Sequence, residues 1–368
     1  MLKATNGFGS STASMIVRVQ PLTSGGSWTN AGNLKFISGS VRGISLPGNR
    51  VLFDWVGTEL YDFNDGTSKQ LPDLPGVSES WVLLPDQKLF ARTSTTTGTT
   101  YDTLTGAIAT VTLDAPGGMR GNLGPQIDDR NWLVTNYFSA GDPPKIEVGF
   151  FEYPSFKYTK TAEIPRPDGF ADGGGGLIGL TKEKNALLWI SRPEARFITI
   201  NPKTGTILGN VPVGNDIRCL LKSRSSVVFP GPVTLLPNGN FLGGYGGVLD
   251  TSQSSLCEYN PATNTVVEGS ILELGSSIGF VLNNGKVFFA PASYNNNPYA
   301  RNIQAGLYDP ISRIGQLTPL FNQERFGEGY VQLSDGRIVV AGGVKPRTYD
   351  GPPDVPQTPL SSIEVYTP

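Results

Sequence analysis

The chain has 368 residues, including 46 glycines and 29 prolines, and only 16% of its residues are charged. Its net charge of −2 provides no basic footprint for nucleic acid or for an anionic membrane surface. The absence of histidine excludes Ser-His-Asp and Cys-His catalysis, and any His-liganded zinc, copper or iron site. We therefore expect no metal, no cofactor, and neither nucleic acid nor membrane as a partner.

Residues 1–22 are rich in Gly, Ser and Thr and precede the first repeated unit. They contain no apolar segment typical of a signal peptide, and no part of the chain approaches the length of an apolar membrane span. We expect an N-terminal arm that docks to a neighbouring virion or scaffold protein. The expected location is a virion, or the cytoplasm before assembly, without secretion through a cleaved signal peptide.

A hairpin pattern then recurs seven times. Each copy has an apolar strand, a short turn and a second apolar strand, and the copies lie at 41–55, 79–92, 121–137, 176–191, 231–247, 278–292 and 328–343. Three of the turns are Asn-Gly or Asp-Gly, pairs that readily adopt the positive φ of tight hairpins. A period of about 40–50 residues with strands alone is typical of a propeller.

A third strand follows each hairpin and ends in an aromatic residue and a turn, as in ELYDFNDG (59–66) and LCEYNPATN (256–264). Tyr is present in six of these seven segments, and Ile200 takes its place in the fourth. A fourth strand follows in six units. The pattern predicts an all-β fold, a seven-bladed β-propeller of four-stranded antiparallel blades, with blades near 39–76, 77–117, 118–169, 170–222, 223–273, 274–324 and 325–368.

The seventh unit ends at VYTP and lacks a fourth strand, whereas SGGSWTNAGNLKFIS (24–38) precedes the first hairpin and has no hairpin of its own. We predict that residues 26–37 complete the last blade, with Trp28 and Tyr366 at the ring closure. The propeller domain would then span residues 23–368. Closure of this kind removes two open sheet edges.

The stretches LPNGNFLGGYGG, LSDGRIVVAGG, LYDP and EYNP, with the joined Tyr-Pro and Trp28, resemble the kelch repeats of galactose-oxidase-like propellers. The resemblance covers about residues 26–368 and implies the propeller architecture. The family's glycine pair is present only at Gly243-Gly244 and Gly342-Gly343. The copper centre of galactose oxidase requires histidines, so the resemblance does not extend to that site.

The longest connections follow the hairpins of the last three units, at 244–255, 291–303 and 342–362. They should emerge opposite the tight turns, on the face where the chain crosses between blades, and we expect the face of the tight turns to be plain. Long loops on a rigid scaffold commonly bind ligands, and Tyr and Arg among small polar residues are typical of recognition surfaces. The candidate binding residues are Tyr245, Tyr294, Tyr299, Arg301, Arg347 and Tyr349. The alternative is that these loops only cover a blade edge.

No catalytic residue is assigned, but a carboxylate-dependent enzyme remains open because a glycosidase needs only two suitably spaced carboxylates. Loop positions carry Asp172, Asp250, Glu328, Asp350 and Asp354. The two cysteines, Cys219 and Cys257, favour buried free thiols over a disulfide.

The leading hypothesis is a non-enzymatic binding or structural propeller, a bacteriophage tail, fibre or head component, that contacts a cell-surface glycan or protein receptor through the loops of blades 5–7. The composition, poor in charge and rich in Gly, Ser, Thr and Asn, favours this hypothesis. Two alternatives remain: a lectin or carboxylate-dependent carbohydrate-active enzyme, and an intracellular kelch-type interaction module.

Overall fold

The computed structural model describes residues 2–6, 9–13, 25–38, 41–54, 57–75, 81–138, 145–165, 175–190, 196–212, 233–246, 254–272, 276–291, 304–325, 328–345 and 358–368. Within these ranges the secondary structure consists of strands alone. The same ranges hold no helix of the length and apolarity needed to cross a membrane.

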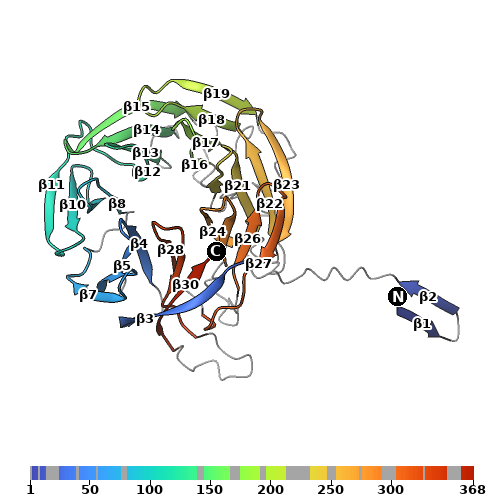
Figure 1. Ribbon diagram of the computed structural model, residues 1–368. Helices are drawn as coiled ribbons and strands as arrows, with labels where there is room; N and C mark the ends of the chain where they lie inside the picture. The colour runs from blue at the N-terminus through green and yellow to red at the C-terminus, as the bar shows by residue number, and fades with distance from the viewer. Residues whose placement is uncertain are drawn as a thin grey trace.

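Seven four-stranded antiparallel sheets form a ring, which confirms the predicted seven-bladed β-propeller (Figure 1). Blade 1 comprises β4 (Arg42–Leu46), β5 (Arg50–Asp54), β6 (Thr58–Asp62) and β7 (Thr67–Leu71). Blade 2 comprises β8 (Val82–Leu83), β9 (Lys88–Arg92), β10 (Thr97–Asp102) and β11 (Ile108–Thr112). Blade 3 comprises β12 (Asn122–Asp128), β13 (Asn131–Phe138), β14 (Lys145–Glu152) and β15 (Lys157–Pro165).

The remaining blades follow the same order from the first, innermost strand to the fourth, outermost strand. Blade 4 comprises β16 (Gly175–Leu180), β17 (Ala186–Ile190), β18 (Arg196–Ile200) and β19 (Ile207–Pro212). Blade 5 comprises β20 (Val233–Leu235), β21 (Phe241–Gly246), β22 (Ser254–Asn260) and β23 (Thr265–Leu272). Blade 6 comprises β24 (Ser276–Val281), β25 (Val287–Pro291), β26 (Gly306–Asp309) and β27 (Ile314–Leu317).

The last blade is closed by the N-terminal strand, as predicted. It comprises β28 (Gly329–Gln332), β29 (Ile338–Ala341), β30 (Leu360–Thr367) and β3 (Ser27–Ser38). Trp28 lies opposite Tyr366 in the register of β3 and β30. The Trp28 ring centroid lies 4.6 Å from that of Phe321 and 5.1 Å from that of Tyr366. The indole N–H donates to the carbonyl of Pro319 over 3.2 Å, which joins the closing strand to the crossing from blade 6.

The core lies between neighbouring blades, because the second strand of each blade is covered on both sides. Every residue of β17 (ALLWI), β25 (VFFAP) and β29 (IVVA) is buried. Strands covered on both faces have continuous rather than alternating apolar sequences. The sequence pattern of apolar second strands therefore reflects their position in the middle of a stack of blades.

In blades 1, 2 and 6 the repeated tyrosine links the third strand to the previous blade. The Tyr101 hydroxyl donates to the carbonyl of Pro72 over 2.6 Å, and the Tyr61 hydroxyl donates to the carbonyl of Ala31. Burial raises the pKa of Tyr101 to about 12, so its hydroxyl remains a donor. In blade 3 the equivalent position, opposite Trp132, is held by Phe151 and not by a tyrosine. Tyr153, which the sequence pattern placed there, follows the strand and precedes Pro154.

Strands β1 (Leu2–Asn6) and β2 (Gly9–Ala13) form a separate two-stranded antiparallel sheet. Their register runs from Leu2 opposite Ala13 to Asn6 opposite Gly9. This hairpin lies apart from the ring, near the label of the N-terminus (Figure 1). The segment predicted as an arm therefore contains a small sheet of its own.

Candidate functional site

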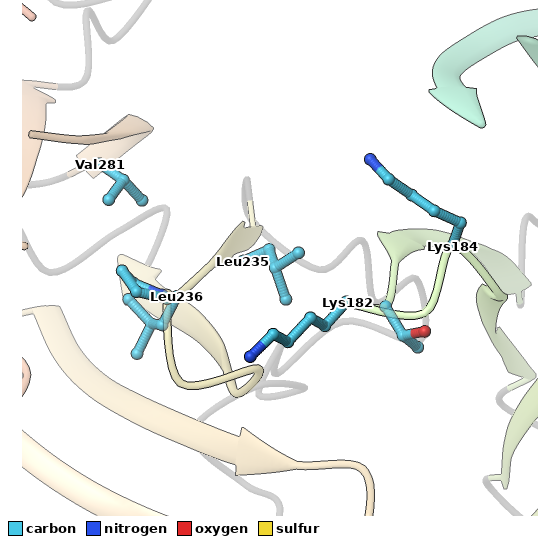
Figure 2. Close-up of a pocket in the computed structure, with 7 residues that line it drawn as sticks. Lys182, Lys184, Leu235, Leu236 and Val281 are labelled. Atoms are coloured by element: carbon cyan, nitrogen blue, oxygen red, sulfur yellow. The ribbon is translucent and has the colours of Figure 1, made fainter. Parts of the chain in front are cut away.

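The tight turns between first and second strands lie at 47–49, 85–87, 129–130, 181–185, 237–240, 283–286 and 334–337, and we call their side of the ring the turn face. The opposite side, where the chain crosses between blades, is the loop face. A pocket of about 370 Å³ opens on the turn face, and its lining residues are Thr181, Lys182, Lys184, Leu235, Leu236, Pro237 and Val281 (Figure 2). The sequence analysis expected this face to be plain and did not predict the pocket.

The pocket lies near the inner edge of the ring. Leu235 and Val281 belong to the innermost strands β20 and β24, and Thr181 directly follows the innermost strand β16. Three successive blades therefore contribute the ends of their first strands. Leu236 is only 2% exposed and provides an apolar floor.

Two lysines stand at the rim of this pocket because of a tight turn in blade 4. The Thr181 N–H donates to the carbonyl of Asn185 over 2.8 Å, and the Lys184 N–H donates back to the carbonyl of Thr181 over 2.9 Å. Lys184 takes a φ of 63°, which places both lysines at the exposed tip. Figure 2 shows Lys182 extending toward Leu235 and Leu236, while Lys184 points away from them.

The pocket combines lysine side chains at its rim with an apolar floor. Within the described part of the chain, neither lysine ammonium forms an ion pair or a hydrogen bond, including with the adjacent Glu183. Pockets that bind small molecules combine apolar walls with a few polar groups that fix orientation. The lining residues include no carboxylate, and the titratable side chains among them are the two lysines.

Neighbouring tight turns on the turn face are joined by hydrogen bonds. The Asn49 side-chain oxygen of blade 1 accepts from the Ser334 hydroxyl over 2.7 Å and from the Asp335 N–H over 3.1 Å. The Asn283 amide of blade 6 donates to the Asp335 carbonyl over 2.8 Å. These bonds connect the tight turns of blades 6, 7 and 1.

On the loop face, most of the predicted binding residues lie outside the described residues: Tyr294, Tyr299, Arg301, Arg347 and Tyr349. Tyr245 lies in β21, and its backbone pairs with Ser255 of β22. Of the loop carboxylates, Asp172, Asp250, Asp350 and Asp354 also lie outside the described residues, as does Cys219. The backbone of Cys257 pairs with Gly243 in β21. The loop-face binding surface stays a prediction.

Glu328, the one loop carboxylate that is described, is buried where the chain enters blade 7. Its side chain is 9% exposed, and its Oε1 accepts a hydrogen bond from the Tyr330 hydroxyl over 2.6 Å. Burial, and next the negative charge of Glu328, raise the pKa of Tyr330 well above its usual range. The phenol therefore stays protonated and acts as a donor to the carboxylate.

A buried ion pair lies in the same blade. Arg325 and Glu364 are 0% and 1% exposed, and their Nη2 and Oε1 atoms are 2.6 Å apart. The Glu364 carboxylate also accepts from the backbone N–H of Asn322 over 2.7 Å and of Gln323 over 3.1 Å. Donors of the crossing from blade 6 thus occupy most of the hydrogen-bonding capacity of this carboxylate. Glu364 therefore has a structural role, because it holds the crossing against blade 7.

Two further buried acids have the same role. Glu59 of blade 1 is 0% exposed, and its Oε2 accepts from the Lys35 N–H over 2.7 Å. Glu258 of blade 5 accepts from the Tyr308 hydroxyl of blade 6 over 3.0 Å. The sequence analysis missed these acids. A usable signal was the repeated Glu-x-Tyr at 59–61 and 364–366, which puts a carboxylate two residues before the buried tyrosine in adjacent blades.

The described residues contain no group of three or more His, Cys, Asp or Glu side chains placed to hold a metal ion. The charged side chains that are both buried and described are Glu59, Glu258, Arg325, Glu328 and Glu364. Each of these has a hydrogen-bonding partner within its own blade, the neighbouring blade or the incoming crossing. The described buried charges therefore hold blades and crossings together.

Comparison with known proteins identifies solved structures of similar fold. The sequence matches no protein-family model and no curated protein at a significant level. Among solved structures, a fungal alcohol oxidase of the AA5 family in complex with copper has a TM-score of 0.59 at 14% identity, over 93% of this chain and 76% of that chain.

Two oligogalacturonate lyases are also similar. One, in complex with manganese, has a TM-score of 0.55 at 11% identity over 94% of both chains. The other, from Vibrio parahaemolyticus, has a TM-score of 0.56 at 10% identity over 93% of both chains. At these identities the likeness shows the fold alone. The chain is thus a seven-bladed β-propeller whose likeness to galactose-oxidase-like proteins is one of architecture.

Proposed function

We propose that the chain is a non-enzymatic binding and structural propeller of a virion, in a bacteriophage tail, fibre or head, that attaches to a neighbouring protein through its N-terminal arm. The observation that carries this proposal is the β1–β2 sheet, which pairs with no strand of the ring. The ring is already closed by β3, so the hairpin adds nothing to the blades. A separate hairpin of this kind is suited to contact with another molecule.

The buried acids support a scaffold role. Glu364 and Glu59 each accept a backbone N–H from the chain entering their blade. Carboxylates held in this way fix the positions of blades rather than meeting a substrate. A rigid ring with long loops would present a receptor-binding surface, and the connections 291–303 and 342–362 on the loop face are our candidates for contact with a cell-surface glycan or protein.

The test is to express the full chain, or a variant lacking residues 1–22, in cells that assemble the proposed particles. In a density gradient of the lysate, the full chain should sediment with particles and the shortened chain should remain with free protein. A full chain found only among free proteins would contradict the virion proposal. Equal melting temperatures of the two chains would show that the deletion removes the arm and leaves the ring folded.

A second candidate function is recognition of an acidic saccharide, and the pocket on the turn face favours it. Lys182 extends over the apolar floor and Lys184 adds a second cation at the rim, a combination that suits a sugar with carboxylates and an apolar ring face. Oligogalacturonate is a suitable probe because two proteins of similar fold act on it. A Lys182→Ser, Lys184→Ser variant should lose binding measured by calorimetry, whereas Lys157→Ser on the outer strand of blade 3 should keep it.

A further inference from the structure

The turns that join the third and fourth strands of each blade, which we call outer turns, lie on the turn face and are capped by Asp in some blades and by Asn in others. In blade 2 the Asp102 side chain accepts the backbone N–H groups of Leu104 over 3.0 Å and Thr105 over 2.9 Å. Asn201 of blade 4 accepts the N–H groups two and three positions later over 2.9 and 3.1 Å, and Asn260 of blade 5 accepts them over 2.9 and 3.2 Å. The hydrogen bonds are the same, so the two kinds of cap differ in charge.

The tight turns show the same exchange of Asp for Asn, with a consequence for the cation that follows. In the SDGR turn of blade 7, Asp335 accepts the Arg337 N–H over 3.1 Å and also pairs with the Arg337 guanidinium over 2.8 Å. In the NNGK turn of blade 6, Asn284 accepts the Lys286 N–H over the same 3.1 Å. An asparagine has no carboxylate, so it caps the turn without neutralising the Lys286 ammonium.

A neutral cap also lies beside the pocket, in the PNGN turn of blade 5. The Asn238 side chain accepts the Asn240 N–H over 3.0 Å, and the preceding Pro237 lines the pocket. A Cβ atom on the following Gly239 would lie 4.0 Å from the Cβ atom of Lys182. Charges act on one another over about 10 Å at 0.1 M ionic strength, so a carboxylate at position 238 would oppose the charge of Lys182. The asparagine that is present does not.

Carboxylates are present in this sector of the turn face, but cations outnumber them. Glu183 is exposed at the tip of the blade 4 turn, and Asp309 caps the outer turn of blade 6, where the charge of Lys286 acts on it. The tight and outer turns of blades 4–6 carry these two acids and the cations Lys182, Lys184, Lys203, Lys286 and Arg313. Cations remain in excess even without Lys203, which pairs with Asp128 of blade 3.

We infer that Asn238 and Asn284 give the pocket its preference for anionic over neutral ligands, because they cap their turns without placing a carboxylate beside the lysines. This inference rests on the proposed recognition of an acidic saccharide and names residues that determine its specificity. Lys182 and Lys184 belong to blade 4 and Lys286 to blade 6, and both blades contribute to the pocket lining. The ligand class that suits this arrangement is an oligomer with a carboxylate on each sugar, which the field of the lysines would attract.

The test measures the binding of oligogalacturonate by calorimetry at about 0.02 M and about 0.15 M ionic strength. Asn238→Asp and Asn284→Asp keep the capping oxygen and add a charge, so each should weaken binding about three- to tenfold at the lower ionic strength and less at the higher. Glu183→Gln should strengthen binding about threefold, a gain that a damaged turn would not give. The matched control is Asn122→Asp, because Asn122 is exposed at the loop-face end of β12, about 20 Å from the turn face. The control should bind like the parent chain, and all variants should melt at similar temperatures.

Two sets of results would overturn the inference and leave saccharide recognition standing. In the first, the parent chain binds oligogalacturonate and both Asp variants bind it equally well, or the control loses as much affinity as they do. In the second, the loss in the Asp variants is the same at both ionic strengths, which would indicate a broken contact and not a charge effect. A parent chain that binds no oligogalacturonate would overturn the saccharide proposal and this inference together, and would leave the proposed virion role unaffected.

Discussion

At the scale of single residues, the chain contains an internal comparison between two buried glutamates at equivalent places in adjacent blades. Glu364 and Glu59 both precede a buried tyrosine by two residues and both accept a backbone N–H from the entering chain. Glu364 also meets the guanidinium of Arg325, whereas Glu59 has one oxygen, Oε1, that is buried without a hydrogen-bond partner. Only one of the two sites therefore has its charge compensated.

The two glutamates should respond differently to the same substitution. Glu364→Gln leaves the Arg325 charge buried without its partner and should lower the free energy of unfolding by about 3–5 kcal/mol. Glu59→Gln removes a charge that is only partly satisfied and should change stability by about 1 kcal/mol or less. Denaturant midpoints of the two variants measure the difference. Equal losses would mean that Arg325 does not set the contribution of Glu364.

The tyrosines of the third strands were visible in the sequence because they recur with the blade period, but their partners were not. The Tyr101 hydroxyl reaches Pro72 and the Tyr308 hydroxyl reaches Glu258, both in the preceding blade. The repeat spacing predicts where each tyrosine lies in its blade. It does not predict which group of the neighbouring blade accepts the hydrogen bond from the tyrosine hydroxyl. For the same reason Tyr153 was assigned to a position that Phe151 occupies, since only the strand register separates them.

At the scale of elements, β3 is the strand on which the ring depends. It pairs with β30 of the last blade, and its Trp28 packs against Phe288, Phe321 and Tyr366. Its role could be predicted because the seventh unit lacked a strand and the N-terminus had a spare one. The hairpin β1–β2 was not predicted, because β1 (LKATN) is short and β2 (GSSTA) has no alternation of apolar and polar residues.

Two deletions should separate these N-terminal elements. Removing residues 1–38 takes away β3 and exposes the edge of β30 and the ring around Trp28, so cooperative thermal unfolding should be lost. Removing residues 1–22 leaves β3 intact and should leave the melting temperature within about 2 °C of the full chain. Calorimetry of the three forms measures both effects. An unchanged transition after the longer deletion would refute closure by β3.

The stability of blade 3 should depend on pH because of two carboxylates, Glu163 in β15 and Asp128 in β12. Hydrogen bonds from Lys160 and then Lys145 lower the pKa of Glu163 from 4.5 to about 2. Burial raises the pKa of Asp128, but hydrogen bonds from Lys203 and the Arg130 N–H outweigh burial and bring it to about 2. Because both folded-state pKa values lie below the unfolded values, the stabilisation is complete above about pH 4.5 and is lost as the pH falls toward 2.

Melting temperatures measured from about pH 6 to pH 2 should show this loss. Both carboxylates are about 40% exposed, so solvent screening keeps each contribution small, and the effect of the pair should be a few °C at most. The double variant Asp128→Asn, Glu163→Gln should melt lower than the parent chain at pH 6 and approach it at pH 2. A constant difference across this range would rule out these ion pairs as the cause.

At the scale of the whole molecule, the fold was predictable because the same local pattern recurs seven times and each copy constrains the others. The position of the pocket was not. It depends on how the strand ends of three blades converge around Leu236, which no single repeat encodes.

The pairing of β3 with β30 brings the two ends of the ring together in space, with Ser27 opposite Thr367. The blade in which the chain begins is therefore arbitrary for the folded ring. A gene that encodes Pro368 followed by a short linker and Gly25, with new ends in the turn at Ile311–Ser312, should produce a circular permutant with the same seven blades. Its strand content by circular dichroism should match that of the parent, even though the chain would begin and end in blade 6.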